Sequence, residues 1–228
     1  MKYLKTMTCA LALCGTSGFA AVVDFENEFP LISDPTYISV GTSYTNGGIT
    51  FTSTEFMQLV GTGGPVNGFV PNDTPGSTAT GPANFGEVFL TGDFKQNTDM
   101  NLSFSTDVTS VAFDIVDIDG GNDSVVGDAQ EEQFTFEAFK GGVSQGSQLV
   151  TSRDLTGALN EAGVVRISFA GLFDEVQITG VTPGGTRGIG WGIDNIETTP
   201  VPVPAAGLML LSALGGIGLM RRRNKRAS

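Results

Sequence analysis

The 228-residue sequence predicts an all-β domain built as a two-sheet antiparallel β-sandwich. From Val22 onward, short apolar alternations are broken about every eight to twelve residues by Gly, Asn, Asp, Ser or Thr, a spacing typical of such sandwiches. No stretch between residues 21 and 199 has the apolar spacing of an amphipathic helix. That segment of about 180 residues is long enough for one domain with its own core.

The first half of this domain contains the less regular strands. Residues 21–26 form the first predicted strand, and residues 49–52 form another that follows a tight Asn-Gly-Gly turn at 46–48. Residues 60–84 are rich in Gly, Pro, Asn and Thr and show little apolar alternation. They predict a long exposed loop, which is either a binding surface or a simple connection.

The second half alternates more regularly, and each of its strands presents one apolar face. With the first half it supplies about eight to ten strands, enough for a jelly roll of two sheets. Its predicted strands are residues 87–90, 101–105, 111–115, 134–139, 165–169, 175–179 and 193–196.

Residues 1–20 are predicted to be a secretory signal peptide with a helical apolar part. They combine a basic start, an apolar middle and a small-x-small cleavage site, which places the cut after Ala20. The alternative is a lipoprotein signal that ends at Cys14. The residue before a lipidated Cys is normally Gly or Ala, whereas here it is Leu13.

Residues 200–228 are predicted to be a membrane-directed tail. An apolar helix over residues 205–220, together with the short motif before it, comes close to the ~20 residues that a bilayer core needs. Basic residues 221–226 follow, and the positive-inside rule keeps them in the cytoplasm, so the domain lies across the membrane. The three residues expected to retain that end are Arg221, Arg222 and Arg223.

The motif before the apolar helix makes the tail specific. The tail resembles the C-terminal sorting signal of PEP-CTERM proteins, in the variant whose motif is Val-Pro-Leu-Pro-Ala, and Val203 stands where that variant has Leu. The resemblance implies processing by an exosortase, a membrane transpeptidase-like enzyme, in a Gram-negative bacterium. A plain single-span anchor is the alternative. The matching residues are Val201, Pro202, Val203, Pro204 and Ala205.

Part of the domain also resembles the domain commonly found ahead of such sorting signals. The similarity lies in four phrases: residues 111–119, 136–139, 173–176 and 191–196. Domains of this kind look like the jelly rolls of carbohydrate-binding modules and legume-lectin-like proteins. Fold likeness by itself assigns no activity.

Charge and composition exclude several classes of function. The segment between the two ends contains five basic residues and all 24 acidic residues, which gives it a formal charge of −19. Such a field repels nucleic acid and anionic lipid and attracts divalent cations. The chain has no His, and its two Cys residues lie in the signal peptide, so Ser-His-Asp, Cys-His and zinc sites cannot form in the domain. A glycosidase that uses two carboxylates remains open.

Two groups of oxygen ligands are candidates for a structural Ca²⁺ site. Asp117, Asp119 and Asp123 crowd a Gly-containing turn whose spacing departs from an EF-hand, and a solvated acidic turn explains them equally well. The second group is implied only by the resemblance, because jelly-roll modules often bind calcium where their first and last strands meet. It consists of Asp24, Glu26 and Asp194.

Trp191 lies among glycines, in the sequence from Gly188 to Ile193. Aromatic rings can stack on sugars, so Trp191 is a candidate ligand platform, with a core position as the alternative.

The sequence therefore predicts three parts: a signal peptide (1–20), an acidic sandwich domain (21–199) and a sorting tail (200–228). The expected protein is exported, transiently anchored in the inner membrane, and then located at the cell surface or in the extracellular matrix, with exopolysaccharide as an expected partner. Its expected role is non-catalytic. The alternatives are a calcium-dependent carbohydrate-binding module and a carboxylate-pair glycosidase.

Overall fold

The computed structural model describes residues 21–31, 37–61, 88–92, 97–118, 131–151, 164–183 and 188–201. These residues, apart from Val201, belong to one compact unit, Ala20–Pro200. The predicted signal peptide and the predicted transmembrane helix lie outside the described residues. Within the described part, no helix has the length and apolar character needed to cross a membrane.

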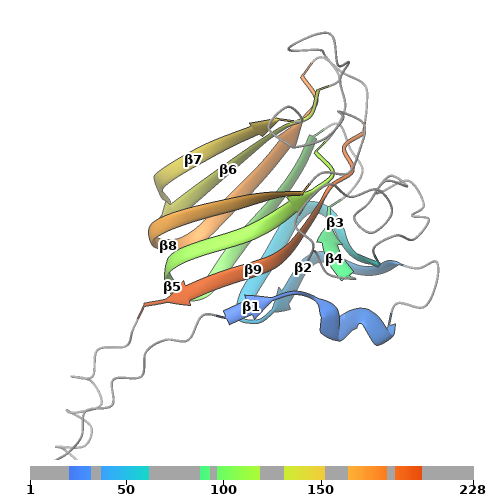
Figure 1. Cartoon of the computed structure of the whole chain (residues 1–228), viewed down its shortest axis with the longest axis horizontal. Coiled ribbons are helices and arrows are strands. Elements are labelled where there is room, and N and C mark those ends of the chain that lie inside the picture. The colour runs from blue at the N-terminus through green and yellow to red at the C-terminus, as the bar shows by residue number, and fades with distance from the viewer. Residues whose placement is uncertain are drawn as a thin grey trace, which may run out of the picture. The chain divides into compact units, whose positions relative to one another are not determined.

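The described part consists almost entirely of strands, and every strand pair is antiparallel, which confirms the all-β antiparallel prediction (Figure 1). One 3-10 helix, η1 (Glu26–Leu31), follows the first strand. The strands are β1 (Ala21–Val23), β2 (Tyr37–Asn46), β3 (Ile49–Gly61), β4 (Val88–Thr91), β5 (Asn97–Val116), β6 (Gln133–Lys140), β7 (Val143–Thr151), β8 (Val164–Val181) and β9 (Gly192–Pro200).

Hydrogen bonding connects these nine strands into one continuous sheet rather than two separate ones. The order is β1-β9-β4-β3-β5-β8-β6-β7, with β2 beside β3 and an additional pairing between β5 and β9. The continuity arises because β5 and β8 are long strands that bend and carry the sheet with them (Figure 1). The first arm of β5 is residues 97–104, of which 101–104 pair with β3, whereas its second arm, residues 108–116, pairs with β9.

Three predicted element boundaries were therefore wrong. Residues 101–105 and 111–115 belong to the single strand β5, and residues 165–169 and 175–179 belong to the single strand β8. The side-chain alternation is lost at the bends, whereas the pairing of β5 with β8 resumes after a register shift. The first strand is also shorter than predicted, because η1 begins at Glu26.

Alternation along the strands separates the core from a solvated face. Residues 175–181 of β8 pair with the first arm of β5 and are here called the first arm of β8. On these two first arms, and on β6, buried side chains alternate with partly or fully exposed ones. The inward side chains join one core cluster with many aromatic rings, in which Phe134 contacts both Phe136 and Trp191. The register also places the exposed Leu149 opposite Thr135, and Phe139 opposite Glu175, on the outward side. The polar side chains of this side form what we call the polar face: Thr50, Thr52, Asp99, Asn101, Ser103, Thr135, Glu137, Ser147, Glu175, Gln177 and Thr179.

The first and last strands of the unit are neighbours. Ala21 lies opposite Thr198 in the β1–β9 pair, and Pro200 lies opposite Val108 at the bend of β5. The β2–β3 turn also reaches this place, since the Ser105 amide donates to the Gly48 carbonyl at 2.9 Å. Four elements that are distant in the sequence thus meet at the bend of β5.

Candidate ligand-binding site

A cavity of about 110 Å³ lies where these four elements meet. Its wall on one side is the β2–β3 turn, in which Gly47 and Gly48 have φ angles of 57° and 81°. A two-residue hairpin turn of this kind needs positive φ at both central positions, and glycine adopts it without strain. The turn chemistry predicted from the sequence therefore also shapes the cavity.

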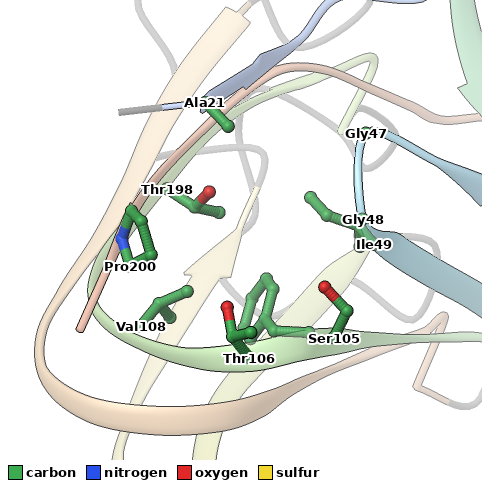
Figure 2. Close-up of a pocket in the computed structure, with 10 residues that line it drawn as sticks. Ala21, Gly47, Gly48, Ile49, Ser105, Thr106, Val108, Thr198 and Pro200 are labelled. Carbon is green, nitrogen blue, oxygen red and sulfur yellow. The ribbon is translucent and has the colours of Figure 1, made fainter. Parts of the chain in front are cut away.

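The lining of the cavity mixes hydroxyl groups with apolar surface and contains no charged side chain. Ser105, Thr106 and Thr198 contribute the hydroxyls, and Figure 2 shows them around one space between the end of β9 and the β2–β3 turn. The apolar contribution comes from Ile49, Phe104, Val108 and Pro200, together with the Ala21 methyl group.

Such a lining suits a small neutral ligand that is rich in hydroxyl groups. An apolar cavity of about 150 Å³ can hold a benzene ring, so a cavity of about 110 Å³ accommodates part of a sugar ring. Each lining hydroxyl can both donate and accept a hydrogen bond, and the apolar side chains can pack against C–H surface. The lining offers no acid, base or nucleophile beyond these weakly reactive hydroxyls.

The bends beside the cavity are held by a surface ion-pair group. Lys140 donates to Asp107 of β5 at 2.7 Å and to Asp174 of β8 at 3.1 Å. These two carboxylates raise the pKa of Lys140, Asp107 having the larger effect. The pKa of Asp174 is lowered, first by the hydrogen bond that the Gly141 amide donates to it and also by Lys140.

A second polar group, which the sequence analysis missed, lies on the second arm of the sheet. Asp114 accepts hydrogen bonds from Arg166 and from the side-chain amide of Asn195, each at 3.0 Å. Arg166 also donates to the Asn195 carbonyl at 3.1 Å and pairs with Glu197 at 2.7 Å. Asn195 has φ 51° and lies within a register shift of the β5–β9 ladder, which lets its side chain reach Asp114.

Trp191 is not a ligand platform. It is fully buried in the core, and its indole N–H donates to the Thr98 hydroxyl at 3.1 Å. A ring with no exposed face cannot stack on a sugar. The alternative prediction, a core residue among glycines, describes Trp191 correctly.

The structure does not bring the second group of calcium candidates together. The Asp24 carboxylate accepts a hydrogen bond from the Glu26 backbone amide at 3.3 Å, and the Glu26 carboxylate accepts one from the Val88 backbone amide at 3.3 Å. Both carboxylates therefore bind backbone amides, one just after β1 and one at the start of β4. Asp194 is fully buried on β9, where it lies opposite Asp114. Among the described residues, no group of three or more acidic side chains is arranged to hold a metal ion.

Most other predicted site residues lie outside the described part of the chain. Asp117 is described and is fully buried with φ 66°, but its predicted partners Asp119 and Asp123 are not described. Of the sorting motif only Val201 is described, and it is exposed. The residues without a described position are Asp119, Asp123, Pro202, Val203, Pro204, Ala205, Arg221, Arg222 and Arg223.

Comparison with known proteins finds no matching family model and no matching curated protein. Several solved structures are similar. The carbohydrate-binding module CBM27-1 of Caldicellulosiruptor saccharolyticus, solved with mannohexaose, is 11% identical over 81% of this chain and 99% of its own, with a TM-score of 0.35.

Two further solved structures show similarity at the same level. TmCBM61, solved with β-1,4-galactotriose, is 13% identical over 78% of this chain and 99% of its own, with a TM-score of 0.33. The K3 adhesin domain of Lys-gingipain from Porphyromonas gingivalis is 10% identical over 78% of this chain and 97% of its own, with a TM-score of 0.31. Similarity at this level assigns neither a family nor a ligand to the chain.

The Asp114 group generates a stability prediction. Asp114 is almost completely buried, so Asp114→Ala leaves Arg166 and Asn195 without their acceptor and should lower the free energy of unfolding by about 3 kcal/mol. Glu197→Ala removes the exposed partner of the same Arg166 and should cost at most about 1 kcal/mol. Urea unfolding of both variants measures the difference, and equal losses would contradict this assignment.

Proposed function

We propose that the domain is a non-catalytic carbohydrate-binding module of an exported protein, and that the cavity at the bend of β5 binds one residue of a neutral glycan. The observation that supports this proposal is the lining of the cavity, which combines hydroxyl side chains with apolar surface and contains no charged side chain. A neutral sugar residue has the matching chemistry, since it offers hydroxyl groups for hydrogen bonding and C–H groups for packing.

The absence of acidic side chains from the lining is informative because the surrounding domain is strongly acidic. Anionic glycans such as uronic acid polymers are repelled by a domain of formal charge −19. A ligand that is held by hydroxyls and van der Waals contact needs no counter-charge. The lining also holds no carboxylate pair, which favours binding over hydrolysis.

We also propose that the protein is exported and sorted through its two ends, as the resemblance to PEP-CTERM proteins implies. The signal peptide would direct export, and residues 201–205 would be recognised by an exosortase while the apolar helix lies in the inner membrane. The glycan-binding domain would then reach the cell surface or the extracellular matrix, with exopolysaccharide as its partner.

Blocking the cavity tests the binding proposal. Thr106 is exposed at the cavity, so Thr106→Trp should fill it and weaken binding of a neutral oligosaccharide at least about tenfold without unfolding the domain. Thr42→Trp, at an exposed position of β2 outside both the cavity lining and the polar face, is the matched control and should bind normally. A glycan array identifies the oligosaccharide, and calorimetry measures the dissociation constants. Normal binding by Thr106→Trp would exclude the cavity, and no binding by the parent protein would refute the proposed function.

The sorting proposal depends on the two prolines of the motif. Replacing Pro202 and Pro204 with Ala leaves the apolar helix intact, so the variant should insert normally but stay at full length in the inner membrane. Cell fractionation followed by immunoblotting measures this outcome. Normal processing of the double variant would reduce the tail to an ordinary anchor.

We propose that calcium stabilises the domain at one of the two predicted locations, the turn that contains Asp117 or the strand end that contains Asp194. A domain of formal charge −19 repels itself, and a bound cation would relieve part of that repulsion. Calcium at a hundredfold its dissociation constant should stabilise the domain by about 2.7 kcal/mol. Thermal melting at fixed ionic strength measures the effect, with Mg²⁺ as the charge control. An equal response to both ions would mean screening alone, and Asp117→Asn and Asp194→Asn would locate a specific site.

A further inference from the structure

The polar face of the first sheet arms differs from the cavity in its electrostatics. Its central row crosses five strands at about 4.8 Å per strand, through Thr52, Asn101, Gln177, Glu137 and Ser147, which lie opposite one another in successive strand pairs. Two further carboxylates, Asp99 and Glu175, belong to the same face. The face has no basic side chain among its described residues.

Lys140, the one lysine in the part of the chain that the structure describes, is already paired. Lys140 ends β6 and forms ion pairs with both Asp107 and Asp174. Two of the three carboxylates on the face also have partners, because Asp99 accepts from the Thr54 amide and Glu175 accepts from Gln177 at 2.8 Å. Glu137 is half-buried in the middle of the face and makes no hydrogen bond or ion pair with any described residue.

We propose that the polar face is a second binding surface, distinct from the cavity, for a polycationic amino-sugar polymer such as glucosamine chains with free amines. Charge complementarity favours a cationic ligand, because the face carries carboxylates without basic residues within a domain of formal charge −19. Hydroxyl and amide side chains outnumber the carboxylates on the face, and they match a polymer with several hydroxyls for each amine. A basic peptide would use the charge but would leave most of these groups unmatched.

Glu137 has a specific role at this surface. Its carboxylate accepts a charge-assisted hydrogen bond from a sugar ammonium, and Gln177 and Asn101 beside it bind the hydroxyls of neighbouring sugar residues. The cavity does not take part in this contact, so the polar face and the cavity act independently.

Binding of a β-1,4-linked glucosamine hexamer to the folded domain tests the proposal, with the fully N-acetylated hexamer and an oligolysine of equal charge as comparison ligands. Calorimetry should show that the glucosamine hexamer binds at least about tenfold more tightly than either, and that salt weakens its binding. Glu137→Gln should reduce that binding about tenfold. Glu197→Gln, which makes the same change in net charge on the other arm, should leave it nearly unchanged.

Each contrary result overturns the proposal. Equal binding of oligolysine would mean a general polycation surface, and equal loss in Glu137→Gln and Glu197→Gln would mean that only the overall field matters. Circular dichroism confirms folding, and Glu175→Gln supplies a second variant if Glu137→Gln does not fold. Because Thr106→Trp blocks only the cavity, it should leave glucosamine binding unchanged. Failure of the polar face and failure of the cavity are thus separate results.

Discussion

The pairing between β5 and β8 is the constraint on which the rest of the structure depends. It runs from Asn97 opposite Val181 to Val116 opposite Val164 and is interrupted only by register shifts at the bend. Because the two strands are bonded along both arms, a bend in one requires a bend in the other. The shared bend sends the first arms toward β3 and β6 and brings the second arm of β5 to β9.

The cavity is a consequence of this bend. Val108 lies opposite both Phe173 and Pro200, so the turning point of β5 contacts the turning point of β8 and the end of the last strand. Ala21, the first residue of β1, also lines the cavity, and the β2–β3 turn with Gly47 and Gly48 forms its remaining side. A site assembled from four elements is held in position by the fold itself, which reduces the ordering cost of binding.

Most of the strands could be predicted from the sequence, but their order in the sheet could not. Period-two alternation located the inward faces of β5 and β8, but it predicted each of them as two strands. The reason is that exposed residues at the bends, such as Thr106, interrupt the alternation although the strand continues. For Trp191, the residue type alone did not decide between an exposed and a buried position. The Asp114–Asn195 contact depends on one left-handed residue, and no local pattern predicts it. The cavity joins positions 21, 47, 106 and 198, whose proximity only the strand order determines.

The two candidate surfaces differ in charge and therefore suit different ligands. The domain has 24 acids against five bases, so a lining without acidic side chains requires that acids be excluded locally. The cavity is such a place, because glycines, hydroxyls and aliphatic side chains meet there. On the polar face, by contrast, Glu137 remains half-buried beside amides, where the lower local dielectric strengthens its attraction for a cation. A polymer containing both neutral and amine-bearing sugars could therefore be held at two chemically different sites of one domain.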